Sequence, residues 1–294
     1  MALFSRFHIG SRVPFLRRVY FWLIVRLKPS RLEINGMWMQ VHRHDNAVTH
    51  SLLNFATYEP FETALLTGLL RPGDVFVDIG ANIGYYTLLA ARAVGPTGRV
   101  VALEPGHENL RLLRSNVAAN SLTNVSVLAL AAGDHTGTLP LFESPTNMGD
   151  HRLYAVDQRD HYDVAVIRLD DQLQQMALVP NVVKIDIQGY EFQAMNGLST
   201  MLAIVDRCVV CSEFWSDGLR SGGSTDPSRY LAFFVDMGFE LYDIDEANAT
   251  LHPLAGDTLA TFASADRETN ILAVKGLNRA ALLAAVPSLV IGAP

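Results

Sequence analysis

One stretch of the chain, residues 75–87, constrains the fold more than any other. It reads Val75-Phe-Val-Asp78-Ile-Gly80-Ala-Asn82-Ile-Gly84-Tyr-Tyr-Thr87. The first five residues have the short apolar pattern of a buried strand, and a helical spacing begins at Tyr85. Gly80 and Gly84 allow a ligand to approach the backbone where the strand passes into the helix. The stretch therefore predicts the ligand-binding strand–turn–helix unit of an α/β protein.

The polar residues around this turn indicate what it binds. A dinucleotide-binding fold has the pattern G-x-G-x-x-G, which places pyrophosphate on the helix N-terminus, but this chain has Asn82 at the middle position. Asp78 repels phosphate and attracts an ammonium group. Glu104 ends the next predicted strand, 24 positions after Gly80, where an acid accepts hydrogen bonds from ribose hydroxyls. A nucleoside that carries an amino acid, such as S-adenosylmethionine, fits both features.

The pattern around this unit extends it into a parallel sheet. Short apolar runs alternate with segments of helical period between residues 59 and 213, as in successive βαβ units. Predicted strands cover residues 75–79, 99–103, 125–130, 182–185 and 208–211, and predicted helices cover residues 60–70, 85–94, 107–119 and 190–202.

Three further regions lie outside this alternation of strands and helices. Residues 134–163 are rich in Gly, Asp and His and long for a connection, so they are a candidate substrate loop or lid. Residues 212–227 form a second predicted flexible loop. Near the end of the chain, residues 239–243 and 270–274 can pair as antiparallel edge strands.

The charge distribution separates the N-terminus from the rest of the chain. Seven Lys or Arg residues and no acid precede Glu33, whereas the remainder has 16 bases and 30 acids. An acidic body argues against nucleic acid as the partner. The basic segment 1–30 is amphipathic, which suits either shallow attachment to an anionic membrane or packing on protein. Because no signal-peptide pattern or spanning apolar run is present, we expect a cytoplasmic protein.

Two short motifs flank the predicted domain and its last parallel strand. Residues 31–41 predict a β-hairpin that turns at Asn35-Gly36. Cys208 and Cys211 form a C-x-x-C, but residues three apart on a strand point to opposite faces. A disulfide between them is therefore excluded, no second pair completes a zinc site, and we expect buried thiols.

Eight motifs carry a resemblance to a known family: Tyr58-Glu59-Pro60, Gly73-Asp74-Val75, Asp78-Ile-Gly-Ala-Asn-Ile-Gly84, Glu104-Pro105, Asn116, Asn120, Ala131-Ala-Gly-Asp134 and Lys184-Ile-Asp186-Ile-Gln-Gly189-Tyr-Glu191. Over roughly residues 57–215 the chain resembles the FkbM-type members of the class I S-adenosylmethionine-dependent methyltransferases. The Lys-Ile-Asp-x-x-Gly-x-Glu motif narrows the resemblance to this family. The family often has Glu where this chain has Gln188, so we assign no acid–base role there.

The resemblance implies a Rossmann-like, seven-stranded, mostly parallel sheet between helices, in residues 57–294. Residues 1–56 then form an N-terminal basic helical segment and the hairpin. The implied activity is methylation of a hydroxyl on a sugar, a glycoside or another small metabolite, with no nucleic acid as partner. The cofactor-binding residues expected from the turn, the ribose acid and the family motifs together are Glu59, Asp78, Gly80, Asn82, Gly84, Glu104 and Asp134.

Three residues are candidates for catalysis. Ligands of an open α/β sheet bind beyond the carboxyl ends of its strands, which makes Asp186 and Glu213 the natural acids. His151, in the long loop, is the natural imidazole base. Alternatively, Asp186 binds only the methionine amino group, Glu213 caps a turn and His151 is an exposed loop residue. Asp186 and Glu213 also leave a Mg²⁺ site open, although two ligands are few for a metal.

Two other functions remain open at this stage. An NAD-dependent oxidoreductase shares the strand–turn–helix unit and the ribose acid, but the chain lacks a Tyr-x-x-x-Lys hydride-site pattern. A non-catalytic nucleoside-binding domain shares the same features and differs only in lacking turnover.

Overall fold

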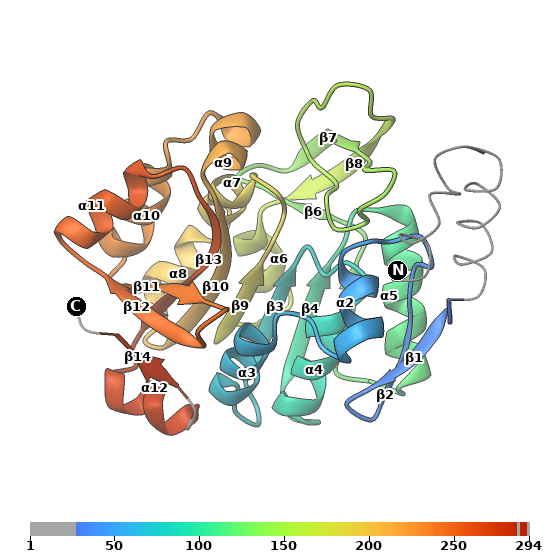
Figure 1. Cartoon of the computed structure of the whole chain (residues 1–294), viewed down its shortest axis with the longest axis horizontal. Coiled ribbons are helices and arrows are strands. Elements are labelled where there is room, and N and C mark those ends of the chain that lie inside the picture. The colour runs from blue at the N-terminus through green and yellow to red at the C-terminus, as the bar shows by residue number, and fades with distance from the viewer. Residues whose placement is uncertain (1–27, 287–288, 293–294) are drawn as a thin grey trace, which may run out of the picture.

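The computed structural model describes residues 28–286 and 289–292, which form one α/β unit around a central sheet (Figure 1). Nine strands make this sheet, in the order β14-β12-β11-β13-β10-β9-β3-β4-β5. Five neighbouring strands are parallel: β3 (Val75–Ile79), β4 (Arg99–Leu103), β5 (Val125–Leu128), β9 (Val182–Ile185) and β10 (Cys208–Trp215). The other four strands are β11 (Glu240–Asp245), β12 (Thr250–Leu254), β13 (Glu268–Lys275) and β14 (Val290–Ile291).

The predicted sheet is confirmed as a mostly parallel α/β sheet, but its size was wrong. Strand β13 pairs antiparallel with both β10 and β11, which confirms the predicted pairing near the C-terminus. Strand β11 is not the edge of the sheet, because β12 pairs with it and β14 pairs with β12. These two added strands come from short segments with little strand periodicity, and each pairs with an edge that another strand offers: β12 with β11, and β14 with β12.

Helices cover both faces of the sheet. One face packs against α2 (Val48–Phe55), α3 (Pro60–Leu69), α4 (Tyr85–Val94) and α12 (Arg279–Ala285). The opposite face packs against α6 (Leu169–Gln175), α7 (Glu191–Asn196), α8 (Ser199–Ile204), α9 (Ser216–Gly223), α10 (Pro227–Asp236) and α11 (Asp257–Ser264). Because side chains alternate along a strand, Phe76 enters the first core and Val77 the second.

The two cysteines follow the same alternation. Cys211 lies in the first core and Cys208 in the second, and both are buried free thiols. The expectation that they face opposite sides of the sheet and do not pair is confirmed.

The hairpin predicted for residues 31–41 is confirmed and consists of β1 (Arg31–Ile34) and β2 (Met37–Gln40). It lies against α5 (His107–Ala119). Asn35 and Gly36 both have positive φ, as the turn requires. Asn116 holds the hairpin, since its Oδ1 accepts from Gln40 N at 2.6 Å and its Nδ2 donates to Gln40 O at 3.0 Å. Asn120 does the same for both backbone groups of Trp38.

Two predicted loops contain helices or strands over part of their length. Within residues 134–163, β7 (Gly137–Phe142) pairs with β8 (His161–Ile167), and β6 (Ala131–Ala132) completes a small three-stranded sheet. Composition suggested a loop because the solvent-facing positions are polar and Pro140 interrupts the run. Leu141, Val164 and Val166 are the buried positions that fix these strands. The irregular part is residues 143–160, between β7 and β8.

The second predicted loop, residues 212–227, holds the end of β10 and helix α9. The predicted helix 190–202 is two helices, because it breaks at Gly197 and Leu198 between α7 and α8. A Cβ at Gly197 would lie 1.9 Å from the backbone oxygen of Gly133. The break is thus imposed by close contact with another segment, which helical periodicity does not reveal.

The predicted basic helix of residues 1–30 lies almost entirely outside the described residues. Among the described helices, none combines the length and apolar character required to cross a bilayer. The boundary at residue 56 and the cytoplasmic location stay predictions.

Candidate active site

The turn that follows β3 brings the backbone close to the end of β9. The N–H groups of Gly80 and Ala81 both donate to Leu103 O, at 3.0 and 2.9 Å. Gly80 has φ +82°, and a Cβ there would lie 2.1 Å from Asp186 O. Only glycine fits at this position, because a side chain would collide with backbone. The close approach places β3, β4 and β9 around one point at the carboxyl end of the sheet.

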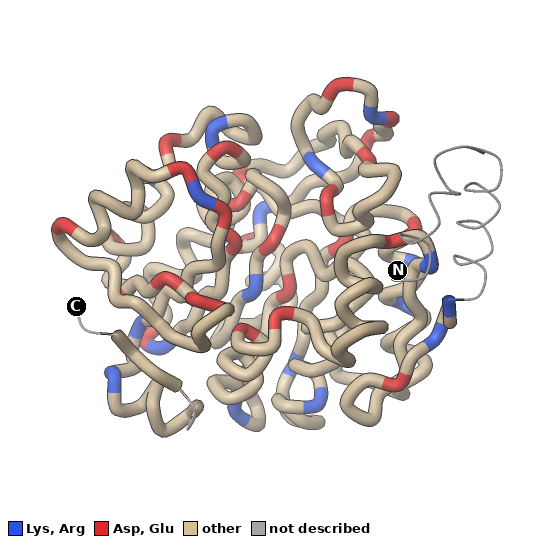
Figure 2. The backbone as a smooth tube through the Cα atoms, viewed as in Figure 1, with Lys and Arg blue, Asp and Glu red and all other residues tan. Residues whose placement is uncertain are grey.

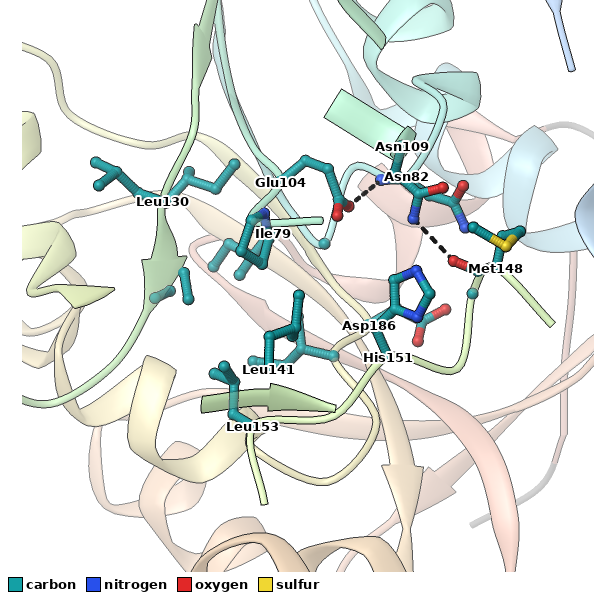
Figure 3. A pocket seen from close by; sticks show the side chains of 17 residues that line it. Ile79, Asn82, Glu104, Asn109, Leu130, Leu141, Met148, His151, Leu153 and Asp186 are labelled. Atoms are coloured by element: carbon teal, nitrogen blue, oxygen red, sulfur yellow. Dashed lines mark hydrogen bonds between the residues drawn. The ribbon is translucent and has the colours of Figure 1, made fainter. Parts of the chain in front are cut away.

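A first cavity opens at this point (Figure 3). Glu104, at the end of β4, is buried, and its two oxygens accept from Asn82 N and Gly106 N, each at 2.8 Å. Burial raises the pKa of Glu104 to about 7, although these two backbone donors favour the ionised form. A carboxylate has about four acceptor positions. Two therefore remain for hydroxyl groups of a ligand.

The other walls of the first cavity are mostly apolar. Figure 3 shows Leu130, Leu141 and Leu153 on one side of Glu104, with His151 and Met148 on the other. Leu130 follows β5 and Leu141 lies in β7, whereas Met148, His151 and Leu153 come from the irregular connection between β7 and β8. A flat apolar group next to Glu104 is what this shape accepts.

A second cavity of about 200 Å³ continues from the first. Gly80, Asn82, Gly149 and Asp186 line both cavities. The second cavity is polar and acidic, and its further lining includes Tyr58, Glu59, Asp78, Tyr85, Tyr86, Lys184, Gln188, Glu213, Glu268 and Asn270.

Asp78 and Glu59 lie at the inner wall of the second cavity. Asp78 accepts from Thr87 Oγ1 at 2.5 Å, and burial raises the pKa of Asp78 to about 6. Glu59 accepts from Tyr86 OH at 2.8 Å and from Asn270 Nδ2 at 3.2 Å. Burial raises the pKa of Glu59 to about 8. Both predicted cofactor residues therefore reach the cavity, where they present carboxyl groups to a ligand.

Gln188 joins the two predicted catalytic acids. Its Nε2 donates to Asp186 Oδ1 at 2.9 Å and to Glu213 Oε1 at 2.8 Å. Glu213 is 7% exposed, and its second oxygen, Oε2, has no hydrogen-bond partner. Burial and the nearby charge of Asp186 raise the pKa of Glu213 well above its usual value. Asp186, Gln188 and Glu213 thus form a bridged pair of carboxyls at the carboxyl ends of β9 and β10.

Glu191 and Lys184 belong to the family motif around Asp186, but the sequence alone indicated no role for them. Glu191 is buried and accepts from the N–H groups of Ile187 and Gly189 at 3.0 to 3.1 Å, so it fixes the loop that carries Asp186 and Gln188. Lys184 Nζ lies 2.8 Å from Glu62 Oε1 on α3, and both side chains are buried. Their spacing within Lys-Ile-Asp-x-x-Gly-x-Glu was the only signal available.

His151 lies at the first cavity rather than beside Glu213. It lines the first cavity but not the second. Its Nδ1 accepts from Ser144 N at 3.1 Å, so in the neutral ring Nε2 carries the proton. Burial lowers the pKa of His151, which favours the neutral form. In this arrangement the remaining nitrogen of the neutral ring is a donor, and the role of His151 as the base of the reaction stays a prediction. The alternative of an exposed loop residue was wrong, because His151 is partly buried and lines the first cavity.

Two other predicted cofactor residues lie away from both cavities. Asp134 is exposed and pairs with His135 at 2.7 Å. Gly84 begins α4 with φ +94°, and a Cβ there would lie 2.6 Å from Leu113 Cδ1. Gly84 is therefore required for packing of α4 on α5, and the segment before Asp134 contributes Ala131 and Ala132 to the first cavity instead.

Within residues 28–286 and 289–292, no group of three or more His, Cys, Asp or Glu side chains is arranged to hold a metal ion. The carboxyls at the second cavity are separated by amide and hydroxyl partners.

Residues 78–241 match the family model described as "Methyltransferase FkbM domain", and this span is more than half of the 294 residues. The chain belongs to the FkbM methyltransferase family. The matched span of this FkbM methyltransferase begins at Asp78 and includes Glu104, Asp186 and Glu213. It supports S-adenosylmethionine-dependent methyl transfer as the class of reaction.

Individual relatives of this FkbM methyltransferase are more distant. The arsenite methyltransferase of Halobacterium salinarum is 33% identical over 79 residues, which are 27% of this chain and 19% of that protein. The ribosomal RNA large subunit methyltransferase E of Nitrosomonas eutropha is 37% identical over 71 residues, 23% of this chain and 34% of its own length. The chain thus spans less than two thirds of either relative.

A solved S-adenosylmethionine-dependent O-methyltransferase from Thermotoga maritima is 14% identical, with a TM-score of 0.41. The similarity covers 78% of this chain and 71% of that one.

Proposed function

We propose that the protein transfers a methyl group from S-adenosylmethionine to a hydroxyl of a sugar, a glycoside or another small metabolite. The observation that carries the proposal is the Glu104 carboxyl, held by two backbone N–H groups beside an apolar cavity that continues into an acidic one. A ligand with a flat base, two hydroxyls and a cationic end matches the apolar cavity, the Glu104 carboxyl and the acidic cavity in turn.

The residues of both cavities fit the cofactor. The free acceptor positions of Glu104 suit the ribose hydroxyls. The apolar side chains of Leu130 and Leu141 suit contact with the adenine ring. Asp186, at the junction of the cavities, suits the methionine ammonium group. When bound, S-adenosylmethionine supplies a methyl group that its sulfonium charge has already activated. The protein then has to orient an oxygen and accept its proton.

Glu213 is our choice for the proton acceptor. Glu213 lines the second cavity, and its buried Oε2 has no hydrogen-bond partner, which leaves an acceptor position for the proton of a hydroxyl bound there. The raised pKa makes the ionised carboxylate of Glu213 a stronger base than an ordinary glutamate. Gln188 fixes the orientation of Glu213 through Oε1, which leaves Oε2 for the acceptor.

The acidic lining of the second cavity favours an acceptor without phosphate, because the described residues that line it offer no unpaired cation. Glu59, Asp186, Glu213 and Glu268 line it, whereas the lining ammonium, Lys184, is paired with a buried glutamate. Figure 2 shows the Lys and Arg residues of the described chain spread over the molecule instead of gathered on one face. Binding of a nucleic acid backbone needs clustered cations. We therefore propose a small neutral acceptor, although one of the two relatives described above is named for ribosomal RNA.

Calorimetric titration of the protein with S-adenosylmethionine, S-adenosylhomocysteine and NAD tests the cofactor. We expect micromolar or tighter binding of the first two, and binding of NAD alone would support the oxidoreductase instead. Transfer of a labelled methyl group to a panel of glycosides and alcohols tests the reaction. If nucleic acid is included in the panel and becomes labelled while no alcohol does, the small-molecule acceptor is refuted. Cofactor affinity with no product from any acceptor would favour a nucleoside-binding domain.

A further inference from the structure

A turn of residues 144–151, between β7 and β8, covers the junction of the two cavities. Met148 lines the first cavity and Gly149 lines both, so this turn lies against the same ligand space as Gly80 and Asp186. The turn is stiffened from within, because Ser144 Oγ accepts from Asn147 N and Asn147 Oδ1 accepts from Gly149 N. Its position over the site depends on contacts to other segments.

The peptide groups on both sides of Met148 are held by side chains from elsewhere in the chain. Met148 N donates to Asp45 Oδ1 at 3.1 Å, and Met148 O accepts from Asn109 Nδ2 at 2.8 Å (Figure 3). Asp45 is 1% exposed, and its second oxygen accepts from Thr49 N at 2.7 Å in the first turn of α2. Asp45 therefore connects α2 directly to the turn.

Asn109 is oriented by the same N-terminal segment. His42 Nε2 lies 2.9 Å from Asn109 Oδ1, and because an amide oxygen only accepts, His42 donates this bond. The bond leaves Asn109 Nδ2 directed at Met148 O. Residues 42–49 thus fix the Met148 peptide twice, once directly and once through Asn109.

We propose that Asp45 is a positioning residue for the cofactor, and that residues 42–49, which lie outside the span matched by the family, are part of the cofactor-binding machinery. The proposal rests on the proposed function, since the ligand it concerns is S-adenosylmethionine. Without Asp45 the buried N–H of Met148 has no partner, and the turn leaves its position over the cavity junction. Binding must then include the cost of ordering the turn, which lowers affinity without removing any group that touches the ligand.

The test compares Asp45→Ala with Asp170→Ala, with S-adenosylhomocysteine as the probe. Asp170 serves as the control because it is also buried, also accepts from two backbone N–H groups, those of Thr200 and Met201, and lines neither cavity, although it additionally pairs with Arg168. We expect the dissociation constant to rise at least tenfold in Asp45→Ala and less than twofold in Asp170→Ala. Equal effects in the two variants would overturn the proposal, because loss of general stability would then explain both.

Hydrogen exchange of the peptide that covers residues 143–152 supplies a second measurement. Asp45→Ala should speed exchange of this peptide in the unliganded protein by tenfold or more, and Asp170→Ala should leave it unchanged. If Asp45→Ala does not fold, His42→Ala takes its place, with an expected threefold loss of affinity through Asn109. Unaltered exchange and affinity in His42→Ala would then refute the role of residues 42–49.

These results remain distinguishable from failure of the proposed function. If the wild-type protein does not bind S-adenosylhomocysteine at all, the cofactor assignment is wrong and the cofactor role of Asp45 falls with it. If the wild type binds and Asp45→Ala binds equally well, only the positioning proposal is wrong.

Discussion

Replacement of Glu104 by Gln should change the pH dependence of stability in a way that can be calculated. Burial raises the pKa of Glu104 from 4.5 to about 7 in the folded protein. A raised folded-state pKa means that the native protein binds a proton more tightly than the unfolded chain does. Stability is therefore highest when the group is protonated and falls as pH rises from about 4.5 to about 7.

The size of this loss follows from the shift. Each pKa unit corresponds to about 1.4 kcal/mol, so the shift of Glu104 removes about 3 kcal/mol of unfolding free energy over that pH range. In Glu104→Gln this titration is absent. The amide Nε2 of Gln would also face the N–H of either Asn82 or Gly106, which lowers stability by about 1–3 kcal/mol at every pH. The absolute stability of the variant is therefore less informative than its pH dependence.

Urea unfolding of the unliganded protein between pH 5 and pH 8.5 measures this difference. We expect the wild type to lose stability relative to Glu104→Gln by about 3 kcal/mol over the titration range. Glu108→Gln on the exposed side of α5 is the control, and it should follow the wild type at all pH values. A stability difference between wild type and Glu104→Gln that does not vary with pH would refute the reasoning.

The same variant tests the ribose assignment. Loss of charge-assisted hydrogen bonds worth about 1.5–3 kcal/mol should raise the dissociation constant of S-adenosylhomocysteine at least tenfold at pH 8. In the wild type this affinity should weaken as pH falls through 7, because a protonated Glu104 offers fewer acceptor positions. An unchanged affinity in Glu104→Gln would remove Glu104 from the cofactor site.

Three further substitutions probe other parts of the molecule. The methyl-transfer rate should fall as pH drops through the raised pKa of Glu213, and Glu213→Gln should lower turnover at least a hundredfold and abolish this pH dependence while cofactor affinity stays within threefold. His151→Ala should weaken binding of S-adenosylhomocysteine more than it lowers turnover at saturating cofactor, and the opposite result in initial-rate measurements would support His151 as the base instead. Asn116→Ala leaves both backbone groups of Gln40 and the oxygen of Ile83 without their partner. Thermal unfolding should therefore show a loss of about 2–3 kcal/mol in the free energy of unfolding. A change below about 0.5 kcal/mol would mean that other contacts hold the hairpin.

The local sequence determined the unit on which the site is built. The apolar run 75–79, the glycine turn and the helix that follows are specified by residues close together in the chain. Glu104 and Asp186, which follow the two strands on either side of β3, were expected at one edge because parallel strands place their carboxyl ends at one edge of a sheet. The opposite orientations of Cys208 and Cys211 followed from the two-residue period of a strand.

Only the tertiary structure decided which neighbouring residues reach the ligand space. Asp134 and Gly84 belong to motifs beside the site, yet one faces solvent and the other packs against Leu113. His151 has the chemistry of a base, and only its hydrogen bond with Ser144 shows which ring nitrogen is already occupied. Propensity and spacing do not encode such contacts, since each depends on the partner that another segment supplies.

The same reason applies to the segment before the family match. Asp45 and Met148 are 103 positions apart, and no pattern in either stretch indicates that they meet. Strand β12 likewise depends on the available edge of β11, and β14 on the edge of β12. Periodicity within a segment determines what that segment becomes, whereas the pairing of distant segments depends on the packed structure as a whole.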